Sequence, residues 1–276
     1  MQKINLLVTL DQNYILPLKV MLSSIFSNHV NVAFDVYMVY SDIPPQQIEE
    51  ISEWVRQDGS NLIPVEMDND LFSDAPISGR YTKAMYYRLL AYKILPENLD
   101  RILYLDPDIL VINPLDSLYE TDLTGYLFAA ASHTALTQVT SRINRLRLNT
   151  YDMPEYYNSG VLLMNLALQR NEMNSKDIFF YVQKNKSKLI LPDQDILNGL
   201  YWDRIKPLDD SIYNFDARKS NIYYLLSSGL KDVDWIMDHT VILHFCGRQK
   251  PWNKGYVNKF SVLYKHYQKQ LFRNDG

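Results

Sequence analysis

The segment that most constrains the fold comprises residues 101–114, RILYLDPDILVINP. Residues 102–105 form an apolar run too short for a core helix, and Asp106-Pro107-Asp108 closes it. Such a run indicates a buried strand, although a buried helical segment has a similar pattern. Side chains at i and i+2 of an extended chain point to one side. We therefore expect Asp106 and Asp108 to direct two carboxylates to one point, just past a strand end stiffened by Pro107.

Two carboxylates held this close suit a divalent cation that also binds a phosphorylated ligand, because hard cations take carboxylate and phosphate oxygens together. The alternative is an ordinary polar turn, since Asp and Pro are common turn residues. The apolar runs on both sides, residues 102–105 and 109–112, support the metal site enough to leave both interpretations open. The rest of the chain has to decide between the two interpretations.

Composition limits the classes of protein. A chain of 276 residues can bury a large core, as one large domain or two small ones. The net charge of −4 gives no sign of a basic face, so we expect no nucleic-acid partner. The single cysteine, Cys246, forms no internal disulfide, and the first apolar run is too short for a signal peptide or membrane span. These features predict a cytoplasmic protein.

Apolar runs and helical patterns alternate along the chain. Strands are predicted at residues 4–10, 34–40, 61–67, 102–105, 127–132, 161–166 and 241–245, and helices at 15–26, 45–58, 83–95, 173–185 and 194–201. This rhythm is typical of crossover units. The sequence therefore predicts one α/β domain with a mainly parallel central sheet flanked by helices.

The segment after residue 247 differs from the rest. It carries seven basic residues and one acidic residue, with six aromatic residues interleaved. A basic, aromatic, amphipathic tail can contact an anionic membrane surface. The alternative, which we favour, is a helix that packs its aromatic residues on the domain.

Ligands of open parallel sheets bind outside the carboxyl ends of the strands. Four polar clusters are predicted to follow strand ends: residues 11–14, 106–108, 192–195 and 244–247, the last followed by Lys250. Each has a structural alternative; Asp193 can be a helix N-cap and His244 a buried core residue. Their shared placement favours a ligand site.

His244 can complete a ligand set with Asp106 and Asp108. Mixed oxygen and nitrogen ligation suits Mn²⁺ better than Ca²⁺, with Mg²⁺ as an alternative. Gly247 allows close approach of the backbone, and Lys250 supplies a positive charge for a phosphate.

The segments VTLDQNY, AMYYRLL, RILYLDPDILV, YYNSGVLLMNL, LPDQDILN and HFCGRQKPW are similar, in order and spacing, to the motifs of glycosyltransferase family 8. That family holds bacterial lipooligosaccharide α-galactosyltransferases and α-glucosyltransferases and, more distantly, glycogenin. The resemblance spans residues 4 to about 255. An Asp-x-Asp alone is unspecific, but it is specific in company with the other motifs.

The resemblance implies a GT-A catalytic domain, which we expect over residues 1–247, followed by a tail over 248–276. The loops near 134–155 and 203–238 match no family motif, and we expect the acceptor to bind against them, beside the donor. It implies Mn²⁺-dependent transfer of galactose or glucose from a UDP-sugar to a glycan, glycolipid or glycoprotein, with retention of configuration. The protein would act in the cytoplasm, with membrane contact as an option for the tail.

The resemblance also implies roles for individual residues. Uracil and ribose would be held by Thr9, Asp11, Asn13 and Tyr14, the metal by Asp106, Asp108 and His244, and the diphosphate by Gly247 and Lys250. The donor sugar would be positioned by Arg88, Asn158, Gly160 and Asp193, with Gln194 beside the anomeric carbon.

Retention requires a covalent intermediate or attack from the leaving-group face. Retaining hydrolases use a carboxylate nucleophile, whereas Gln194 is a poor one. We therefore favour same-face attack, with a phosphate oxygen accepting the acceptor's proton. Asp193 and Asp195 remain candidate nucleophiles.

Three other functions compete with this one. A catalytically silent UDP-sugar-binding module would keep the fold but lose a metal ligand, and all three candidates are present. A self-glucosylating primer like glycogenin would use one of the 21 tyrosines. A nucleotidyltransferase would carry a Gly-rich basic loop after the first strand, which LDQNY is not.

Overall fold

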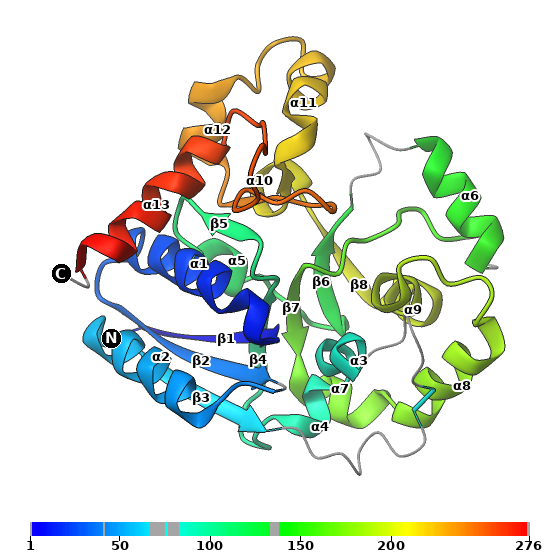
Figure 1. The fold of residues 1–276 in the computed structure, drawn as a ribbon. Coiled ribbons are helices and arrows are strands. Elements are labelled where there is room, and N and C mark those ends of the chain that lie inside the picture. Colours follow the sequence, from blue (N-terminus) through cyan, green and yellow to red (C-terminus); the bar gives the residue numbers. More distant parts are fainter. Residues whose placement is uncertain are drawn as a thin grey trace.

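The computed structural model describes residues 2–40, 42–66, 75–76, 83–132, 138–148 and 150–274 (Figure 1). Its centre is a seven-stranded sheet in the order β3-β2-β1-β4-β7-β6-β8. The strands are β1 Gln2–Leu10, β2 Val32–Tyr40, β3 Asn61–Glu66, β4 Arg101–Leu105, β6 Phe128–Ala131, β7 Val161–Asn165 and β8 Ile205–Leu208.

Most neighbouring strands of this sheet are parallel. Strands β3, β2, β1 and β4 run in one direction, and β6 is parallel to β8, whereas β7 is antiparallel to both β4 and β6. The prediction of a mainly parallel sheet flanked by helices is confirmed. The antiparallel β7 brings its first residues to the carboxyl end of β4, where the backbone N–H of Asp106 donates to the carbonyl of Gly160 at 2.8 Å.

Successive side chains of a strand point to opposite faces of the sheet. Helices cover both faces, so both sets of side chains are buried. In β1, Ile4, Leu6 and Val8 pack with α1 and α2, while Leu7 belongs to the opposite core. That opposite core includes residues of α3, α4, α7, α8 and α9. The helices are α1 Ile15–Ser27, α2 Pro45–Gln57, α3 Lys83–Leu89, α4 Ala91–Ile94, α7 Leu166–Glu172, α8 Ser175–Asn185 and α9 Pro192–Tyr201.

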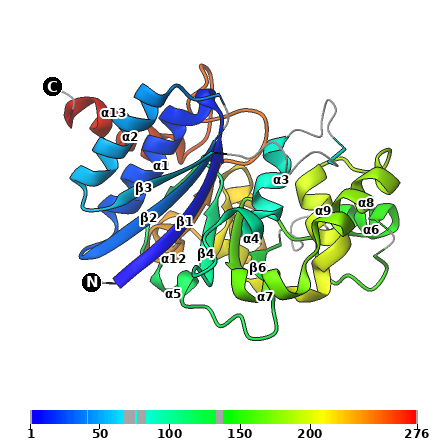
Figure 2. The same ribbon diagram turned by 90° about the horizontal axis from the view of Figure 1, so that it is seen from below.

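These helices follow from local sequence. In α2, Pro45 stands in the first turn, where a missing N–H costs nothing, and Ile48, Ile51 and Val55 form its buried stripe. The helix predicted at 83–95 is divided at Leu90 into α3 and α4. Figures 1 and 2 show α1 and α2 at one end of the molecule and α8 and α9 at the other.

A second sheet of three strands has the order β5-β10-β9, with bounds β5 Ile109–Val111, β10 Ile242–His244 and β9 Phe215–Asp216. Strand β10 is antiparallel to β5 and parallel to β9. The strand predicted near 241–245 is therefore confirmed, but it lies outside the central sheet. His244 reaches the end of β4 because β5 follows β4 directly and pairs with β10.

The two segments expected as acceptor-side loops contain regular structure. In the first, residues 138–148 form α6 Gln138–Leu148 and residues 150–155 are a turn and irregular chain; residues 134–137 and 149 lie outside the described residues. The second contains η4 Trp202–Arg204, β8, α10 Asp210–Tyr213, β9, η5 Ala217–Lys219, α11 Ser220–Leu226 and α12 Val233–His239. We expected loops because neither segment matches a family motif, and the short strands and helices of the second segment carry little periodic signal.

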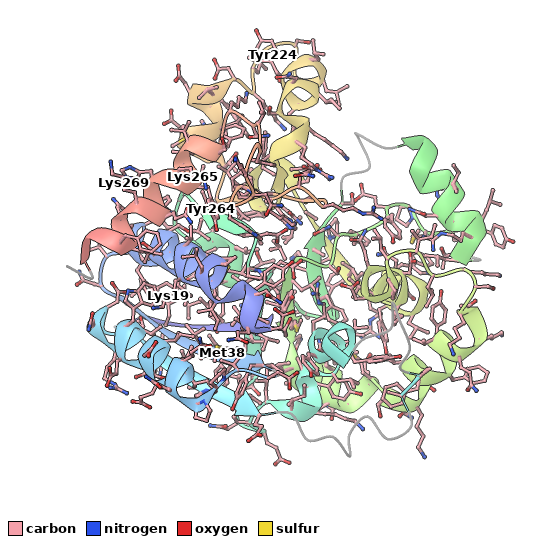
Figure 3. The ribbon with its side chains drawn as sticks, viewed as in Figure 1. Lys19, Met38, Tyr224, Tyr264, Lys265 and Lys269 are labelled. Atoms are coloured by element: carbon pink, nitrogen blue, oxygen red, sulfur yellow. The ribbon has the colours of Figure 1, made fainter. Side chains whose placement is uncertain are left out.

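The tail forms α13 Ser261–Asn274, which lies along α1 (Figure 1). Phe260, Tyr264 and Leu271 are buried in a third core beside the second sheet, whereas Lys265 and Lys269 are exposed (Figure 3). The tail therefore packs its aromatic residues on the domain, as predicted, except for Phe272, which is 62% exposed. Among the described residues, no helix is both long and apolar enough to cross a membrane.

Candidate active site

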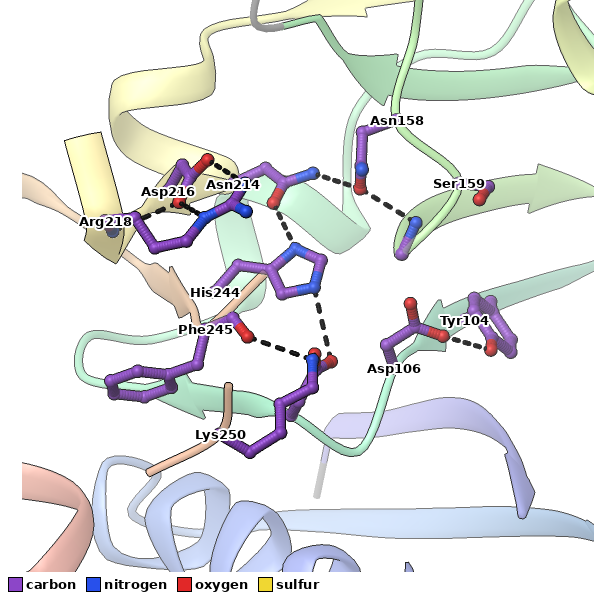
Figure 4. Close-up of polar contacts among 12 residues, drawn as sticks. Tyr104, Asp106, Asn158, Ser159, Asn214, Asp216, Arg218, His244, Phe245 and Lys250 are labelled. Carbon is purple, nitrogen blue, oxygen red and sulfur yellow. Dashed lines mark hydrogen bonds and ion pairs between the residues drawn. The ribbon is translucent and has the colours of Figure 1, made fainter. Parts of the chain in front are cut away.

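Three potential metal ligands meet where the two sheets touch. Asp106 follows β4, Asp108 precedes β5 and His244 ends β10, and one ligand atom of each lies within 4.8 Å of the others. No other such group occurs in the part of the chain that the structure describes. The Nε2 atom of His244 lies 3.2 Å from Oδ1 of Asp108 (Figure 4).

The two carboxylates converge for a different reason from the one expected. Residues 107–108 form a turn and not a continued strand, so the simple alternation of an extended chain does not apply. The turn at Pro107 brings Asp108 back toward Asp106. The predicted pairing of the carboxylates is found, with this change of geometry.

The residues present fit a hard divalent cation. Two carboxylates and one imidazole form a donor set suited to Mn²⁺ or Mg²⁺. Gly160 leaves space beside them, since a Cβ there would lie 2.7 Å from Oδ2 of Asp106 and 2.5 Å from Cε1 of His244. A side chain at residue 160 would displace both ligands.

Charges around Asp108 keep it ionised. Burial raises the pKa of this carboxyl, but His244 and Lys250 outweigh burial and hold the pKa well below its usual value. The Lys250 ammonium donates to Oδ2 of Asp108 and to the carbonyl of Phe245, the latter at 3.1 Å. Burial lowers the pKa of His244, yet Cys246 and Asp108 together raise it.

Asn214 orients the His244 ring. Its Oδ1 lies 2.8 Å from Nδ1 of His244, and its Nδ2 donates to Oδ1 of Asn158 at 3.0 Å, so both ends of the amide are assigned. Nδ1 is then the protonated nitrogen, which leaves Nε2 facing Asp108 and the cation position. Sequence reasoning missed Asn214, because a fully buried Asn before a two-residue strand belongs to no recognisable pattern.

Replacing Asn214 with Ala is expected to weaken Mn²⁺ binding by roughly 10- to 100-fold, since the ring loses the group that fixes its tautomer. Titration with Mn²⁺, read as free ion by electron paramagnetic resonance, measures this without turnover. Asn214→Asp keeps the acceptor for Nδ1 and should recover most of the affinity. Wild-type affinity in the Ala variant would show that Asn214 has no such role.

Arg88 of α3 joins the metal cluster to α9. Its guanidinium pairs with Oδ1 of Asp106 at 3.0 Å and Oδ2 of Asp193 at 2.9 Å, and lies over the Tyr104 ring at 4.5 Å. Burial lowers the pKa of Arg88, but the nearby acidic groups, Asp106 first among them, raise it by more. The pKa therefore lies above its usual value, and the guanidinium stays positively charged. Burial raises the pKa of Asp106, and Arg88 opposes that rise.

The other residues expected near the donor sugar belong to the same network. Gly160 donates its N–H to Oδ1 of Asn158 at 2.9 Å, and Nδ2 of Asn158 donates to Oε1 of Gln194 at 3.1 Å. The hydroxyl of Ser159 donates to Asp193 at 2.9 Å. Residues 192–195 start α9 after α8, so the expectation that they follow a strand is wrong.

The residues expected at uracil and ribose lie at the carboxyl end of β1, next to β4. Thr9 is buried, with its hydroxyl 3.2 Å from that of Tyr104. Asp11 caps the short helix η1 Gln12–Tyr14 by accepting the N–H of Asn13 at 2.8 Å. Tyr14 packs edge-on to Trp252, with ring centroids 5.9 Å apart, which places it near the segment that holds Gly247 and Lys250.

Asp195 is not brought to this cluster. It is fully buried and accepts hydrogen bonds from both Nη atoms of Arg147 at 2.6 Å, from Tyr156 at 2.5 Å, and from the N–H groups of Ile190 and Leu191 at 2.6 and 3.0 Å. A carboxylate with five donors and no exposed surface cannot attack a substrate. The prediction of Asp195 as a candidate nucleophile is therefore corrected: it ties α6 to α9.

Comparisons with known proteins show the family of this chain. The family model "Glycosyl transferase family 8" matches residues 5–255. General stress protein A of Bacillus subtilis (strain 168) is 26% identical over 270 residues, covering 93% of this chain and 90% of that protein. Lipopolysaccharide 1,2-glucosyltransferase of Escherichia coli (strain K12) is 26% identical over 273 residues, covering 95% and 76%.

The fold is also found among solved structures. The crystal structure of the galactosyltransferase LgtC with donor and acceptor sugar analogues matches with a TM-score of 0.81 at 21% identity, covering 97% of this chain and 96% of that one. This agreement confirms the expected GT-A fold. Because the family model covers most of the chain, the protein belongs to glycosyl transferase family 8 and is a glycosyltransferase.

Proposed function

We propose that this protein transfers galactose or glucose from a UDP-sugar to a carbohydrate-bearing acceptor, with retention of configuration and with Mn²⁺ as the preferred cation. The observation that carries the proposal is the convergence of Asp106, Asp108 and His244 beside Lys250. This arrangement suits a nucleoside diphosphate, whose phosphates need a cation and a fixed positive charge. The matching lipopolysaccharide glucosyltransferase supports an acceptor of the cell-surface glycolipid or polysaccharide class.

In this proposal the donor extends from the end of β1 to the start of α9. Thr9, Asp11, Asn13 and Tyr14 hold uracil and ribose, and Gly247 and Lys250 hold the diphosphate. Arg88, Asn158, Gly160 and Asp193 position the sugar. Three contacts support this: Arg88 pairs with Asp193, Asn158 donates to Gln194 and Ser159 donates to Asp193. They fix these side chains before the donor binds.

The residues also suggest how the bond to UDP is broken. Cleavage develops negative charge on the leaving phosphate, and a bound divalent cation would stabilise that charge. Lys250 adds a second fixed positive charge in a site shielded from water. Asp193 is already paired with Arg88, and Asp195 is buried, so the carboxylates of α9 are poor nucleophiles. We therefore keep same-face attack beside Gln194, with the acceptor proton passing to a phosphate oxygen of the donor.

The experiment that tests this function is UDP release from a panel of UDP-sugars without acceptor, with Mn²⁺, with EDTA, and with Mn²⁺ restored after EDTA. We expect slow release from one hexose donor, lost with chelator and regained on add-back. Tight UDP binding without release would identify a silent binding module. Hexoses added to the protein, seen by mass spectrometry, would identify a self-glucosylating primer.

The location of the protein belongs to the same proposal. We place it in the cytoplasm. The exposed face of α13, where Lys265 and Lys269 stand beside Val262 and Phe272, is the surface that would contact an anionic membrane. Cosedimentation with vesicles containing anionic lipid at low salt tests the contact. Equal recovery with and without vesicles would rule it out.

A further inference from the structure

A groove of about 450 Å³ opens beside Gly247. Its volume lies in the range of small-ligand sites. Two of its lining residues, Arg218 and Arg248, are arginines, and no acidic residue is among the described residues that line it. The whole chain carries a net charge of −4, so the groove has the opposite sign to the protein as a whole. A concave positive surface of this kind concentrates anions.

The Arg218 side chain is held in place by Asp216. Asp216, fully buried at the end of β9, accepts from Nε of Arg218 at 2.9 Å, from Nη2 at 2.7 Å and from its backbone N–H at 3.1 Å (Figure 4). The side chain of Arg218 is nonetheless 46% exposed. A buried carboxylate therefore fixes the orientation of a guanidinium that remains open to a ligand.

Gly247 leaves the Arg218 guanidinium uncovered in the groove. Gly247 has φ +92°, and a Cβ there would lie 2.5 Å from Nη1 of Arg218, so a side chain would cover the arginine. Tyr256 lines the same groove, and its buried hydroxyl has no hydrogen-bond partner among the described residues. An unpaired buried hydroxyl indicates a place where a ligand or water is needed.

The groove adjoins the reaction centre. Strand β9 runs parallel to β10 with Asp216 opposite His244, so Arg218 stands beside the residues that follow His244. In the proposed function, Lys250 and the metal ligands would already hold the donor phosphates. Arg218 is thus placed to bind a second anionic group, next to the donor.

We propose that this groove receives the acceptor, and that the acceptor carries a negatively charged group, a phosphate or a carboxylate, which Arg218 binds. The inference rests on the proposed function, since it names the class of molecule to which the sugar is transferred. Helix α6 also carries arginines, but Arg147 there is only 13% exposed and pairs with the buried Asp195.

The test is calorimetric titration of protein saturated with UDP and Mn²⁺, so that the diphosphate position is filled. The probes are glucose 6-phosphate, glucuronic acid and neutral glucose. A charge-assisted contact predicts that at least one anionic probe binds about tenfold more tightly than glucose. Comparison of the two anionic probes then decides between phosphate and carboxylate.

Variants assign the effect to the groove. Arg218→Gln should remove the tenfold preference and leave UDP affinity within about twofold. Arg248→Gln removes a groove charge without touching Asp216, so it should reduce the preference even if loss of Arg218 harms folding. Arg56→Gln, an exposed arginine of α2, is the matched control and should change nothing.

Three results would overturn the inference: no preference for either anion in the wild type, a preference that survives in both groove variants, or a tenfold loss of UDP affinity in Arg218→Gln, which would assign Arg218 to the donor. Wild-type protein that fails to bind UDP would instead refute the proposed function, and this inference with it.

Discussion

Replacing Asp108 with Asn is expected to lower metal-dependent UDP release by at least about 1000-fold, which corresponds to about 4 kcal/mol in the activation barrier. The Asp108 side chain is 10% exposed and contacts both His244 and Lys250. Asparagine keeps the shape but removes the charge that a cation needs and the partner that positions Lys250. Two effects on the leaving phosphate are therefore lost together.

The measurement is UDP release at saturating donor across a range of Mn²⁺ concentrations, accompanied by direct Mn²⁺ titration. Asp100→Asn is the matched control, since Asp100 is exposed, just before β4 and away from the ligand cluster. The control should retain wild-type activity. If Asp108→Asn keeps Mn²⁺-dependent release within tenfold of the wild type, the metal assignment is wrong.

The second large effect concerns stability. Asp195→Asn is expected to lower the free energy of unfolding by about 3–5 kcal/mol, because it breaks a buried ion pair. Arg147 would keep its charge without a counter-ion. The amide nitrogen of Asn would also face donors: either the N–H groups of Ile190 and Leu191, which both bind Oδ2, or Tyr156 and Nη2 of Arg147, which both bind Oδ1. Denaturant unfolding at equilibrium measures the loss.

The same variant separates a structural role from a catalytic one. Below its unfolding transition, folded Asp195→Asn should release UDP at a rate within tenfold of the wild type, since its side chain has no access to substrate. Asp203→Asn, exposed after α9, should change stability by less than about 0.5 kcal/mol. If Asp195→Asn is as stable as the wild type but shows no turnover, the result would identify Asp195 as the nucleophile and contradict the structural role.

Much of the fold could be predicted from local patterns. Apolar runs such as residues 102–105 are buried on both faces, so they identify strands without knowledge of their partners. The polar residues that follow those runs had to lie at strand ends, which is why Asp106, Asp108 and His244 could be proposed as one group. Each of these signals comes from a few neighbouring residues.

Strand direction was not available from such signals. The antiparallel β7 and the separate sheet of β5, β9 and β10 depend on hydrogen bonds between residues distant in sequence, as between Leu110 and Leu243. Runs of the same composition can pair in either direction. Only the tertiary structure decided that Gly160 would lie beside Asp106.

The sequence by itself therefore determined the longer strands, the family and the group of potential metal ligands, because these depend on periodicity and on motifs of neighbouring residues; the short strands β5, β8 and β9 were not predicted. Tertiary structure decided which polar side chains share a site. Asp193 and Asp195 look equivalent in LPDQD, yet residues two apart on a helix point to nearly opposite sides, so one pairs with Arg88 and the other is buried with Arg147. Asn214 and Arg218 acquired their roles only from the strand pairing that sets them beside His244 and Gly247.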